Sequence, residues 1–272
     1  MFDDFSMKLK DKVIVITGAS SGIGKSSAHQ FAKEGSLVAL GARRLERLQT
    51  IKNDLENDNP QLKERILIHP LDVTVPDQIR IFFSEIAKNF GQIDVLVNNA
   101  GVGCVGRIAS VDLNFVRQVM ETNFFGALQC IQEALRIMKP KGHIINISSV
   151  VGKRAVPEIG AYCASKFALN ALSDALRVEL KGSGVHVTTI CPGLTETEFA
   201  EKQIRPNRVN PYKTKWKGQS SKQVAKAIVK AVKKRPREIH LSLGGNFLVH
   251  MERISPRFID RILQYRGMVT EN

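Results

Sequence analysis

The chain has 272 residues, a formal net charge of +14 at neutral pH, 43% hydrophobic residues and 24% charged residues. Proportions this close to the globular average exclude global disorder and collagen-like order. The sequence contains no apolar run of about 18 residues, which excludes an ordinary membrane-spanning helix, and its length suits one large α/β domain.

The positive charge is concentrated in the last quarter of the chain. Residues 202–272 contain 17 Lys and Arg against 4 Asp and Glu, a net +13, whereas residues 1–201 contain 23 against 22, a net +1. Nucleic acid is the first partner to consider for a strongly basic chain. Because the excess is confined to one segment with few interleaved aromatic residues, we do not favour a nucleic-acid partner.

Two further features bear on the cellular compartment. The stretch Met1–Lys12 has no apolar core, so we expect no secretory leader. The cysteines are far apart in the sequence and form no CxxC pair, which is typical of a reducing compartment; they are Cys104, Cys130, Cys163 and Cys191. We therefore expect a cytoplasmic protein.

The first 190 residues alternate short apolar runs with longer segments of helical periodicity. Strands are predicted, in chain order, at Lys12–Thr17, Ser36–Ala42, Arg65–Asp72, Ile93–Val97, Gly142–Ser149 and Val185–Cys191. Helices are predicted between them at Gly22–Glu34, Leu45–Glu56, Asp77–Asn89, Val111–Met138 and Ala161–Lys181. Apolar runs that barely alternate indicate strands buried on both faces, so we expect a doubly wound parallel sheet of the Rossmann type.

The pattern changes after the sixth strand. A polar loop is expected over residues 193–218, followed by a helix over Ser221–Lys234 and a short strand over Glu238–Leu243. Ser255 and Pro256 are typical of an N-cap and a first helical position, so a last, basic amphipathic helix should start there.

Glycines mark the first turn between a strand and a helix, which reads Thr17-Gly18-Ala19-Ser20-Ser21-Gly22-Ile23-Gly24. Glycines permit a tight turn with close backbone approach, and the N–H groups at a helix N-terminus can bind a pyrophosphate. A glycine cluster alone could be an ordinary loop. Its position at the first βα turn favours a dinucleotide site.

Further motifs follow in a fixed order. These are Asn98-Asn99-Ala100-Gly101 after the fourth strand, Asn123 in the long helix, Ser149 at the end of the fifth strand, Tyr162 and Lys166 in a YxxxK pair, and Pro192-Gly193 after the sixth strand. Together with the TGxxxGxG turn, this order over residues 12–197 resembles the short-chain dehydrogenase/reductase family. The resemblance implies a nicotinamide-dependent oxidoreductase acting on a C=O/CH–OH pair, commonly as a homodimer or homotetramer.

The YxxxK pair predicts the acid–base group. Tyr162 and Lys166 are four residues apart, so they share one helix face, and we expect the ammonium to lower the tyrosine pKa. Tyr162 can then exchange a proton with the substrate oxygen, while Ser149 stabilises the charge that develops there. The resemblance implies that Lys166 also holds the nicotinamide ribose and that Asn123 holds a water linking Lys166 to solvent. Without the other motifs, a Tyr and a Lys at this spacing are commonly two exposed residues of a helix without a catalytic role. Ser148-Ser149 at a strand end is then commonly an ordinary turn.

The end of the second strand bears on the choice of cofactor. It reads Gly41-Ala42-Arg43-Arg44, without the carboxylate that binds the ribose 2′-hydroxyl of NAD(H). Guanidinium groups grip a phosphate, so we expect NADP(H), although the two arginines could instead start a solvated helix. The family often has a basic residue inside the glycine turn where this chain has Ser20 and Ser21, which leaves NAD(H) as a weaker alternative.

The remaining cofactor contacts come from the resemblance. They are placed at Thr17, Gly18, Ser20, Ser21, Gly22, Ile23, Gly24, Arg43, Arg44, Asp72, Val73, Asn99, Ala100, Gly101, Tyr162, Lys166, Pro192, Gly193, Thr195 and Thr197. Asp72 could equally cap the turn after the third strand. The six histidines are scattered and no HExxH pattern occurs, so we expect no metal site.

We therefore expect one domain over 1–272, with a cofactor-binding and catalytic core at 12–191, a substrate loop at 193–218 and a basic part at 219–272. Apolar residues after the fifth and sixth strands suggest an apolar or medium-sized carbonyl or alcohol substrate. The basic residues of 202–272 could be a solvated face, or could meet an acyl carrier or an anionic membrane surface. The rival hypothesis is a basic nucleic-acid or membrane-binding protein that keeps the fold. The set Asn123, Ser149, Tyr162 and Lys166 favours the enzyme.

Overall fold

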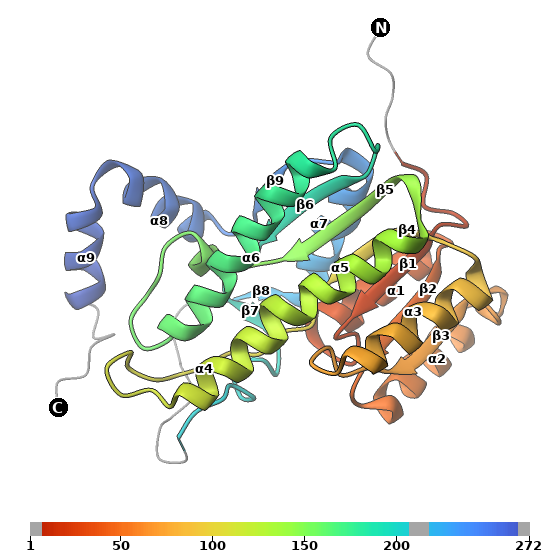
Figure 1. Cartoon of the computed structure of the whole chain (residues 1–272), viewed down its shortest axis with the longest axis horizontal. Coiled ribbons are helices and arrows are strands. Elements are labelled where there is room, and N and C mark those ends of the chain that lie inside the picture. The colour runs from red at the N-terminus through yellow and green to blue at the C-terminus, as the bar shows by residue number, and fades with distance from the viewer. Residues whose placement is uncertain (1–6, 207–217, 266–272) are drawn as a thin grey trace, which may run out of the picture.

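The computed structural model describes residues 7–206 and 218–265, and over these residues the largest sheet has seven strands in the order β3-β2-β1-β4-β5-β6-β9 (Figure 1). The strands are β1 (Val13–Thr17), β2 (Leu37–Ala42), β3 (Ile66–Pro70), β4 (Ile93–Asn98), β5 (Met138–Ile147), β6 (His186–Cys191) and β9 (Glu238–His240). All neighbouring pairs in this sheet are parallel. The strand order reverses between β1 and β4, and the crevice at such a switch point is where this architecture binds ligands.

Helices cover both faces of the sheet, as the apolar strands require. All five residues of β1 are buried, which is expected for a strand covered on both sides. One face packs against α1 (Gly22–Lys33), α2 (Leu45–Asp58) and α7 (Ser221–Lys234). The other packs against α3 (Pro76–Phe90), α5 (Gly126–Ile137) and α6 (Gly160–Glu179). The predicted doubly wound fold is confirmed.

The two hydrophobic layers contain large side chains that are completely buried. Phe31 of α1 lies in one layer and Phe82 of α3 in the other, and each has 0% exposure. Burying one such side chain stabilises the fold by about 1.5–3 kcal/mol. These layers hold the carboxyl ends of the strands, which carry the polar motifs, in a fixed arrangement.

The long helix predicted over Val111–Met138 is interrupted. The chain forms α4 (Leu113–Met120), then a π-helical turn at Glu121–Phe125, then α5, and β5 already starts at Met138. A π-helical turn inserts one extra residue into the helical repeat and is frequent at functional sites. Here the turn contains Asn123, which is 1% exposed.

In the C-terminal part, the last helix starts where the sequence predicted, but the segment before it differs from the prediction. Instead of a strand over Glu238–Leu243, β9 stops at His240 because Ser242 accepts a hydrogen bond from Gly245 N at 3.0 Å and caps α8 (Leu243–Ile254). The last helix, α9 (Pro256–Tyr265), starts at the expected proline. In Figure 1, α8 and α9 lie at the opposite end of the molecule from α2 and α3.

A second, smaller sheet lies beside the carboxyl ends of the main strands. It pairs β7 (Thr195–Glu196) with β8 (Gln219–Ser220) in parallel. Among the described residues, the helices are too short or too polar to cross a bilayer.

Candidate active site

The glycine turn is packed against the end of β4. Gly18 has φ +65°, and a Cβ at this position would lie 2.8 Å from Ala100 Cα, so only glycine fits. Thr17 Oγ1 accepts hydrogen bonds from Asn99 N at 3.1 Å and from Ala100 N at 3.0 Å. The motifs TGxxxGxG and NNAG therefore form one unit in space.

The start of α1 suits an anion. Ser21 is extended, and within the described residues its side chain makes no capping bond and the first turn of the helix contains no acid. The helix dipole and free N–H groups at such an end favour a phosphate. Nearby, Arg44 Nη1 is buried without a hydrogen-bond partner in the described part of the chain. An anionic dinucleotide fits these residues.

The two arginines after β2 have different environments. The Arg43 side chain is 69% exposed, and its Nη1 lies 4.0 Å from Asp72 Oδ2. The Arg44 side chain is 30% exposed and turns inward, where its Nη2 lies 3.0 Å from both Ser20 Oγ and Ser21 Oγ. The description of a solvated helix start therefore suits Arg43 and not Arg44. Arg44 brings positive charge to the serines that replace the basic residue of the turn.

Asp72 matches the simpler of its two interpretations. Its Oδ1 accepts hydrogen bonds from Thr74 N at 3.0 Å and Thr74 Oγ1 at 2.8 Å, so it caps the turn after β3. Val73 is 5% exposed and contacts Gly126 at the start of α5. Asp72 is nevertheless close to Arg43, at the carboxyl ends of β2 and β3.

The segment after β6 reaches back to the glycine turn. Pro192 O accepts hydrogen bonds from Val150 N at 3.0 Å and from Ser149 Oγ at 3.4 Å. Thr195 Oγ1 donates to Gly193 O at 3.2 Å. A Cβ at Gly22, which has φ +53°, would lie 3.0 Å from Thr197 Cγ2. The structure thus brings the expected contacts from both ends of this core together.

Ser149, Tyr162 and Lys166 come from β5 and α6. Ser149 follows β5, and its hydroxyl lies close enough to Tyr162, in the first turn of α6, to affect the tyrosine pKa. Lys166, one turn further along, is 5% exposed, and its Nζ donates to Ile147 O at 2.9 Å. The packing of α6 against the end of β5 therefore places hydroxyl, phenol and ammonium groups in one site.

Asn123 is held by three hydrogen bonds. Its Oδ1 accepts from Val102 N at 2.8 Å, and its Nδ2 donates to Val102 O and to Ser165 Oγ, both at 2.9 Å. Ser165 Oγ in turn donates to Tyr162 O at 2.7 Å. Sequence reasoning missed Ser165. It is four residues before Leu169 on the buried side of α6, and no motif marked it as a link between the π-helical turn and the tyrosine.

Gly101 separates Asn123 from Lys166. A Cβ at Gly101 would lie 3.2 Å from Asn123 Oδ1 and 3.6 Å from Lys166 Nζ. The missing side chain therefore allows the amide and the ammonium to approach one another from two different elements. The structure thus brings these two predicted residues near one another, and the water that the resemblance implies between them stays a prediction.

The pKa values contradict one expectation. Burial raises the pKa of Tyr162 above its usual range, although the nearby Ser149 hydroxyl opposes this shift. Burial also lowers the pKa of Lys166 to about 8. The prediction that Lys166 lowers the tyrosine pKa is wrong for the protein alone, because Nζ lies 5.9 Å from the ring centroid and is hydrogen-bonded to Ile147 O. Loss of hydration outweighs the attraction of that distant charge.

An apolar cluster lies beside Tyr162. Val156 and Ile159 precede the tyrosine, while Ile259 and Leu263 come from α9, and all four are less than 9% exposed. Leu248 and Met251 of α8 also pack against this cluster. The cluster therefore places α8 and α9 beside Tyr162, a connection that sequence analysis did not make. Residues 207–217 of the predicted substrate loop lie outside the described residues.

One histidine is less isolated than its sequence position indicated. The ligand atoms of Cys191, Glu238 and His240 lie within 4.8 Å of one another. His240 Nε2 lies 2.5 Å from Glu238 Oε1, and Glu238 Oε2 also pairs with Lys153 Nζ at 2.6 Å. The pairing of β6 with β9 produces this cluster, and its carboxylate is neutralised by a protein cation.

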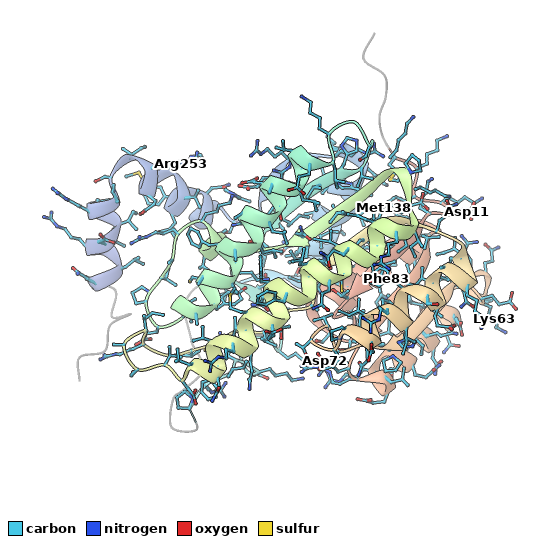
Figure 2. All side chains as sticks on the ribbon, viewed as in Figure 1. Asp11, Lys63, Asp72, Phe83, Met138 and Arg253 are labelled. Carbon is cyan, nitrogen blue, oxygen red and sulfur yellow. The ribbon has the colours of Figure 1, made fainter. Side chains whose placement is uncertain are left out.

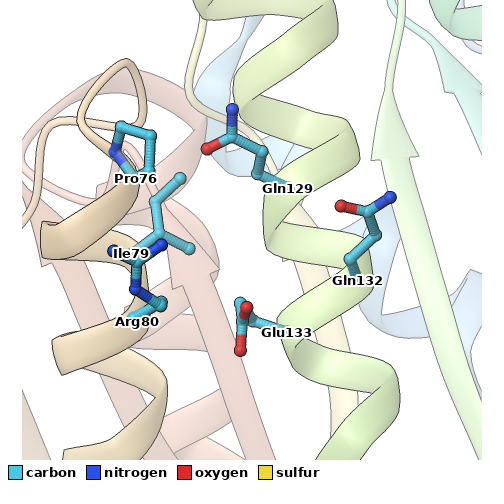
Figure 3. Close-up of a pocket in the computed structure, with 6 residues that line it drawn as sticks. All are labelled: Pro76, Ile79, Arg80, Gln129, Gln132 and Glu133. Carbon is cyan, nitrogen blue, oxygen red and sulfur yellow. The ribbon is translucent and has the colours of Figure 1, made fainter.

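A recess of about 150 Å³ lies between α3 and α5, away from these motifs (Figure 3). Its lining consists of Pro76, Ile79, Arg80, Gln129, Gln132 and Glu133. This lining includes none of the residues that sequence analysis assigned to the site.

Known proteins are similar to this chain in sequence and in fold. Residues 12–208 match the family profile described as short chain dehydrogenase. A Drosophila melanogaster relative, "Dehydrogenase/reductase SDR family protein 7-like", is 32% identical over 98% of this chain and 84% of its own length. The "Farnesol dehydrogenase" of Aedes aegypti is 39% identical over 71% of this chain and 81% of its own length.

A solved structure gives the same result at the level of the fold. The alcohol dehydrogenase of Thermococcus sibiricus complexed with 5-hydroxy-NADP superimposes with a TM-score of 0.73 at 30% identity, covering 85% of this chain and 96% of its own.

Proposed function

The chain belongs to the short-chain dehydrogenase/reductase family, and on that basis we propose that it is an NADP(H)-dependent oxidoreductase that interconverts a carbonyl and a secondary alcohol. The observation that carries this proposal is the convergence of Ser149, Tyr162 and Lys166 beside the glycine turn. A protein that only binds nucleic acid or membrane has no need of this set, so we do not favour that alternative.

In the proposed mechanism a nicotinamide bound beside the glycine turn would supply or accept the hydride at the substrate carbon. In the direction of reduction, the Tyr162 hydroxyl donates its proton to the carbonyl oxygen, and Ser149 donates a hydrogen bond to the same oxygen as negative charge develops. Lys166 holds the nicotinamide ribose, and Asn123 positions a water through which the phenolate regains a proton. The Tyr162 phenol, whose pKa is raised by burial, is protonated at neutral pH and can donate this proton.

The cofactor preference is inferred from the charge after β2. Arg43 is exposed and only loosely paired with Asp72, so its guanidinium group is accessible to a ribose 2′-phosphate. Arg44 lies against Ser20 and Ser21 and is also paired with Glu198, so it adds positive charge at this end of the site. The related Thermococcus sibiricus structure is a complex with 5-hydroxy-NADP. NAD(H) remains the weaker alternative for this chain.

The substrate class is inferred from the apolar cluster beside Tyr162. Side chains such as Val156, Ile259 and Leu263 cannot satisfy a strongly polar substrate. We propose an apolar or medium-sized carbonyl or alcohol. The name of the Aedes aegypti relative, a farnesol dehydrogenase, is in keeping with this class.

The experiment follows nicotinamide absorbance while the protein is offered NADPH or NADH with a panel of apolar aldehydes, ketones and acyl thioesters. We expect oxidation of NADPH with at least one carbonyl of the panel. A protein that binds neither nucleotide would contradict the proposal.

We propose that the chain forms one domain and assembles as a homodimer or homotetramer. Its basic C-terminal part is a candidate docking surface. Figure 2 shows Arg253 on the outer side of α8, away from the sheet, and Phe247, Ile254 and Phe258 are 56%, 76% and 46% exposed. Exposed apolar and basic side chains on adjacent helices suit an anionic membrane surface. Co-sedimentation with anionic vesicles at low salt tests this peripheral association, and absence of binding would leave a solvated face or an acyl-carrier surface as the alternatives.

A further inference from the structure

Glu198 lies at the centre of a cationic cluster. Its Oε1 lies 2.5 Å from Arg44 Nη2, while its Oε2 lies 3.0 Å from Arg47 Nη1 and 2.8 Å from Lys202 Nζ. Ser21 also lies close enough to help lower the pKa of this carboxylate. Three cationic side chains on one carboxylate are more than a typical surface ion pair provides.

This cluster coincides with the anion site described above. The Arg44 Nη2 atom that contacts Glu198 also lies 3.0 Å from Ser20 Oγ and Ser21 Oγ in the glycine turn. The neighbouring Thr197 contacts Gly22 in the same turn. In the structure, therefore, the chain's own carboxylate lies where the adenosine end of an anionic cofactor is expected.

Glu198 belongs to a strap, residues 195–206, that crosses the site. At one end β7 pairs with β8. At the other end Ile204 N donates to Gly103 O at 2.8 Å, and Val105 N donates to Ile204 O at 2.9 Å. Between them, the Phe199 ring centroid lies 5.6 Å from that of Tyr162. Glu198 is thus a polar anchor of a segment that is also held by backbone pairing and ring contact.

The location of the Glu198 carboxylate bears on the choice between NADP(H) and NAD(H). Enzymes of this architecture that use NAD(H) have a carboxylate at the end of the second strand, which accepts a hydrogen bond from the ribose 2′-hydroxyl. That position is occupied here by Ala42, which offers no acceptor. Glu198, 154 residues after Arg44 in the sequence, brings a carboxylate to the same end of the site from the opposite side.

We propose that Glu198 sets the discrimination between NADP(H) and NAD(H): a 2′-phosphate must displace its carboxylate from Arg44 and Arg47, whereas a 2′-hydroxyl can donate to it. This inference rests on the proposed nicotinamide-dependent function. Two anions cannot share the same guanidinium groups without mutual repulsion. A neutral hydroxyl causes no such repulsion and adds a hydrogen bond.

The carboxylate keeps its charge over the working pH range. The hydrogen bond from Arg44 is the main reason why the pKa of Glu198 lies well below its usual range. The Glu198 carboxylate therefore stays charged near neutrality, and the discrimination depends on the identity of residue 198.

The experiment measures dissociation constants of adenosine 2′,5′-bisphosphate and of 5′-AMP by calorimetry, for the full chain and for Glu198→Gln. The matched control is Glu201→Gln, which removes the same charge from an exposed residue of the strap whose side chain makes no ion pair within the described residues. We expect Glu198→Gln to increase the preference for the bisphosphate over 5′-AMP roughly tenfold, the scale of one charge-assisted contact, and Glu201→Gln to leave the ratio unchanged.

Each outcome decides the proposal. An unchanged or lower ratio in Glu198→Gln overturns the role of Glu198 while leaving the proposed function intact, provided that both nucleotides bind. Failure of the unaltered chain to bind either nucleotide overturns the proposed function and this inference with it.

Hydrogen exchange of the unaltered chain provides a test that does not depend on the fold of a variant. Adenosine 2′,5′-bisphosphate should accelerate exchange at the amides of Phe199 and Lys202, whereas 5′-AMP should not. Equal exchange with the two nucleotides would show that the carboxylate is not displaced.

Discussion

Lys166 Nζ lies 5.9 Å from the centroid of the Tyr162 ring and is directed at a backbone carbonyl, that of Ile147. The ammonium and the phenol are therefore neighbours without a direct hydrogen bond. Burial acts on both in the direction of the neutral form: it raises the pKa of the tyrosine and lowers that of the lysine to about 8. In the protein alone the phenol is protonated at neutral pH, ready to donate.

Replacing Tyr162 with Phe removes this proton and little else, since the ring and its contact with Phe199 remain. We expect turnover to fall by about 10²–10⁴-fold, the usual contribution of a positioned acid. NADPH binding, measured by fluorescence, should stay nearly unchanged. Turnover close to that of the unaltered protein would remove Tyr162 from its proposed role.

The titration of Lys166 should appear in the pH profile. Because its pKa is lowered to about 8 by burial, the side chain is charged below that pH and neutral above it. We expect kcat/KM for the cofactor, which reports groups of the free protein, to fall as the pH rises above about 8. Lys166→Arg retains the charge at all these pH values and should abolish this fall, even if its rate is lower. A profile of Lys166→Arg that still falls near pH 8 would assign the titration to another group.

Replacing Arg43 with Asp should reverse the sign of charge beside the adenosine ribose. We expect the preference for NADPH over NADH, expressed as the ratio of kcat/KM values, to fall roughly tenfold or more, because a charge-assisted contact is lost and a repulsion is gained. Arg80→Asp is the matched control, since Arg80 is also exposed and also lies beside an aspartate, Asp77. Equal cofactor ratios in the two variants would count against Arg43 as a phosphate ligand.

Asn123 should contribute to stability as well as to catalysis. Asn123→Ala leaves Val102 N–H and the Ser165 hydroxyl without this partner in a buried site. We expect the free energy of unfolding to fall by about 1–3 kcal/mol, the cost of leaving a buried polar group unpaired, in urea titrations monitored by circular dichroism. Asn114→Ala, at an exposed position of α4, should change it by less than about 0.5 kcal/mol. Equal stabilities for the two variants would show that the buried amide network is dispensable.

The sequence predicted the parallel sheet because its strands are apolar on both faces, and it predicted helix α7 to the residue, Ser221–Lys234. It did not predict the π-helical turn around Asn123. The repeat length of the apolar pattern is the same before and after one inserted residue, so the pattern still reads as one continuous helix. The separate helix α8 was also missed, since its start depends on a single cap at Ser242.

Within the site, local motifs could be predicted from the sequence, whereas contacts between distant parts of the chain could not. Tyr162 and Lys166 are neighbours on one helix, so their spacing carries the information. The contact of Glu198 with Arg44 joins residues 154 positions apart. No periodicity or motif encodes such a pair, and it exists only because β6 and β2 end at the same edge of the sheet.

The packing of α9 beside Tyr162 also determines when the site can be completed. Synthesis proceeds from the N-terminus, and domains begin to fold as the chain emerges. The glycine turn and the tyrosine helix are made early, but Ile259 and Leu263 close the apolar cluster only when almost the whole chain is available. A nascent or C-terminally clipped chain would therefore carry Tyr162 without the α9 side of the apolar cluster beside it.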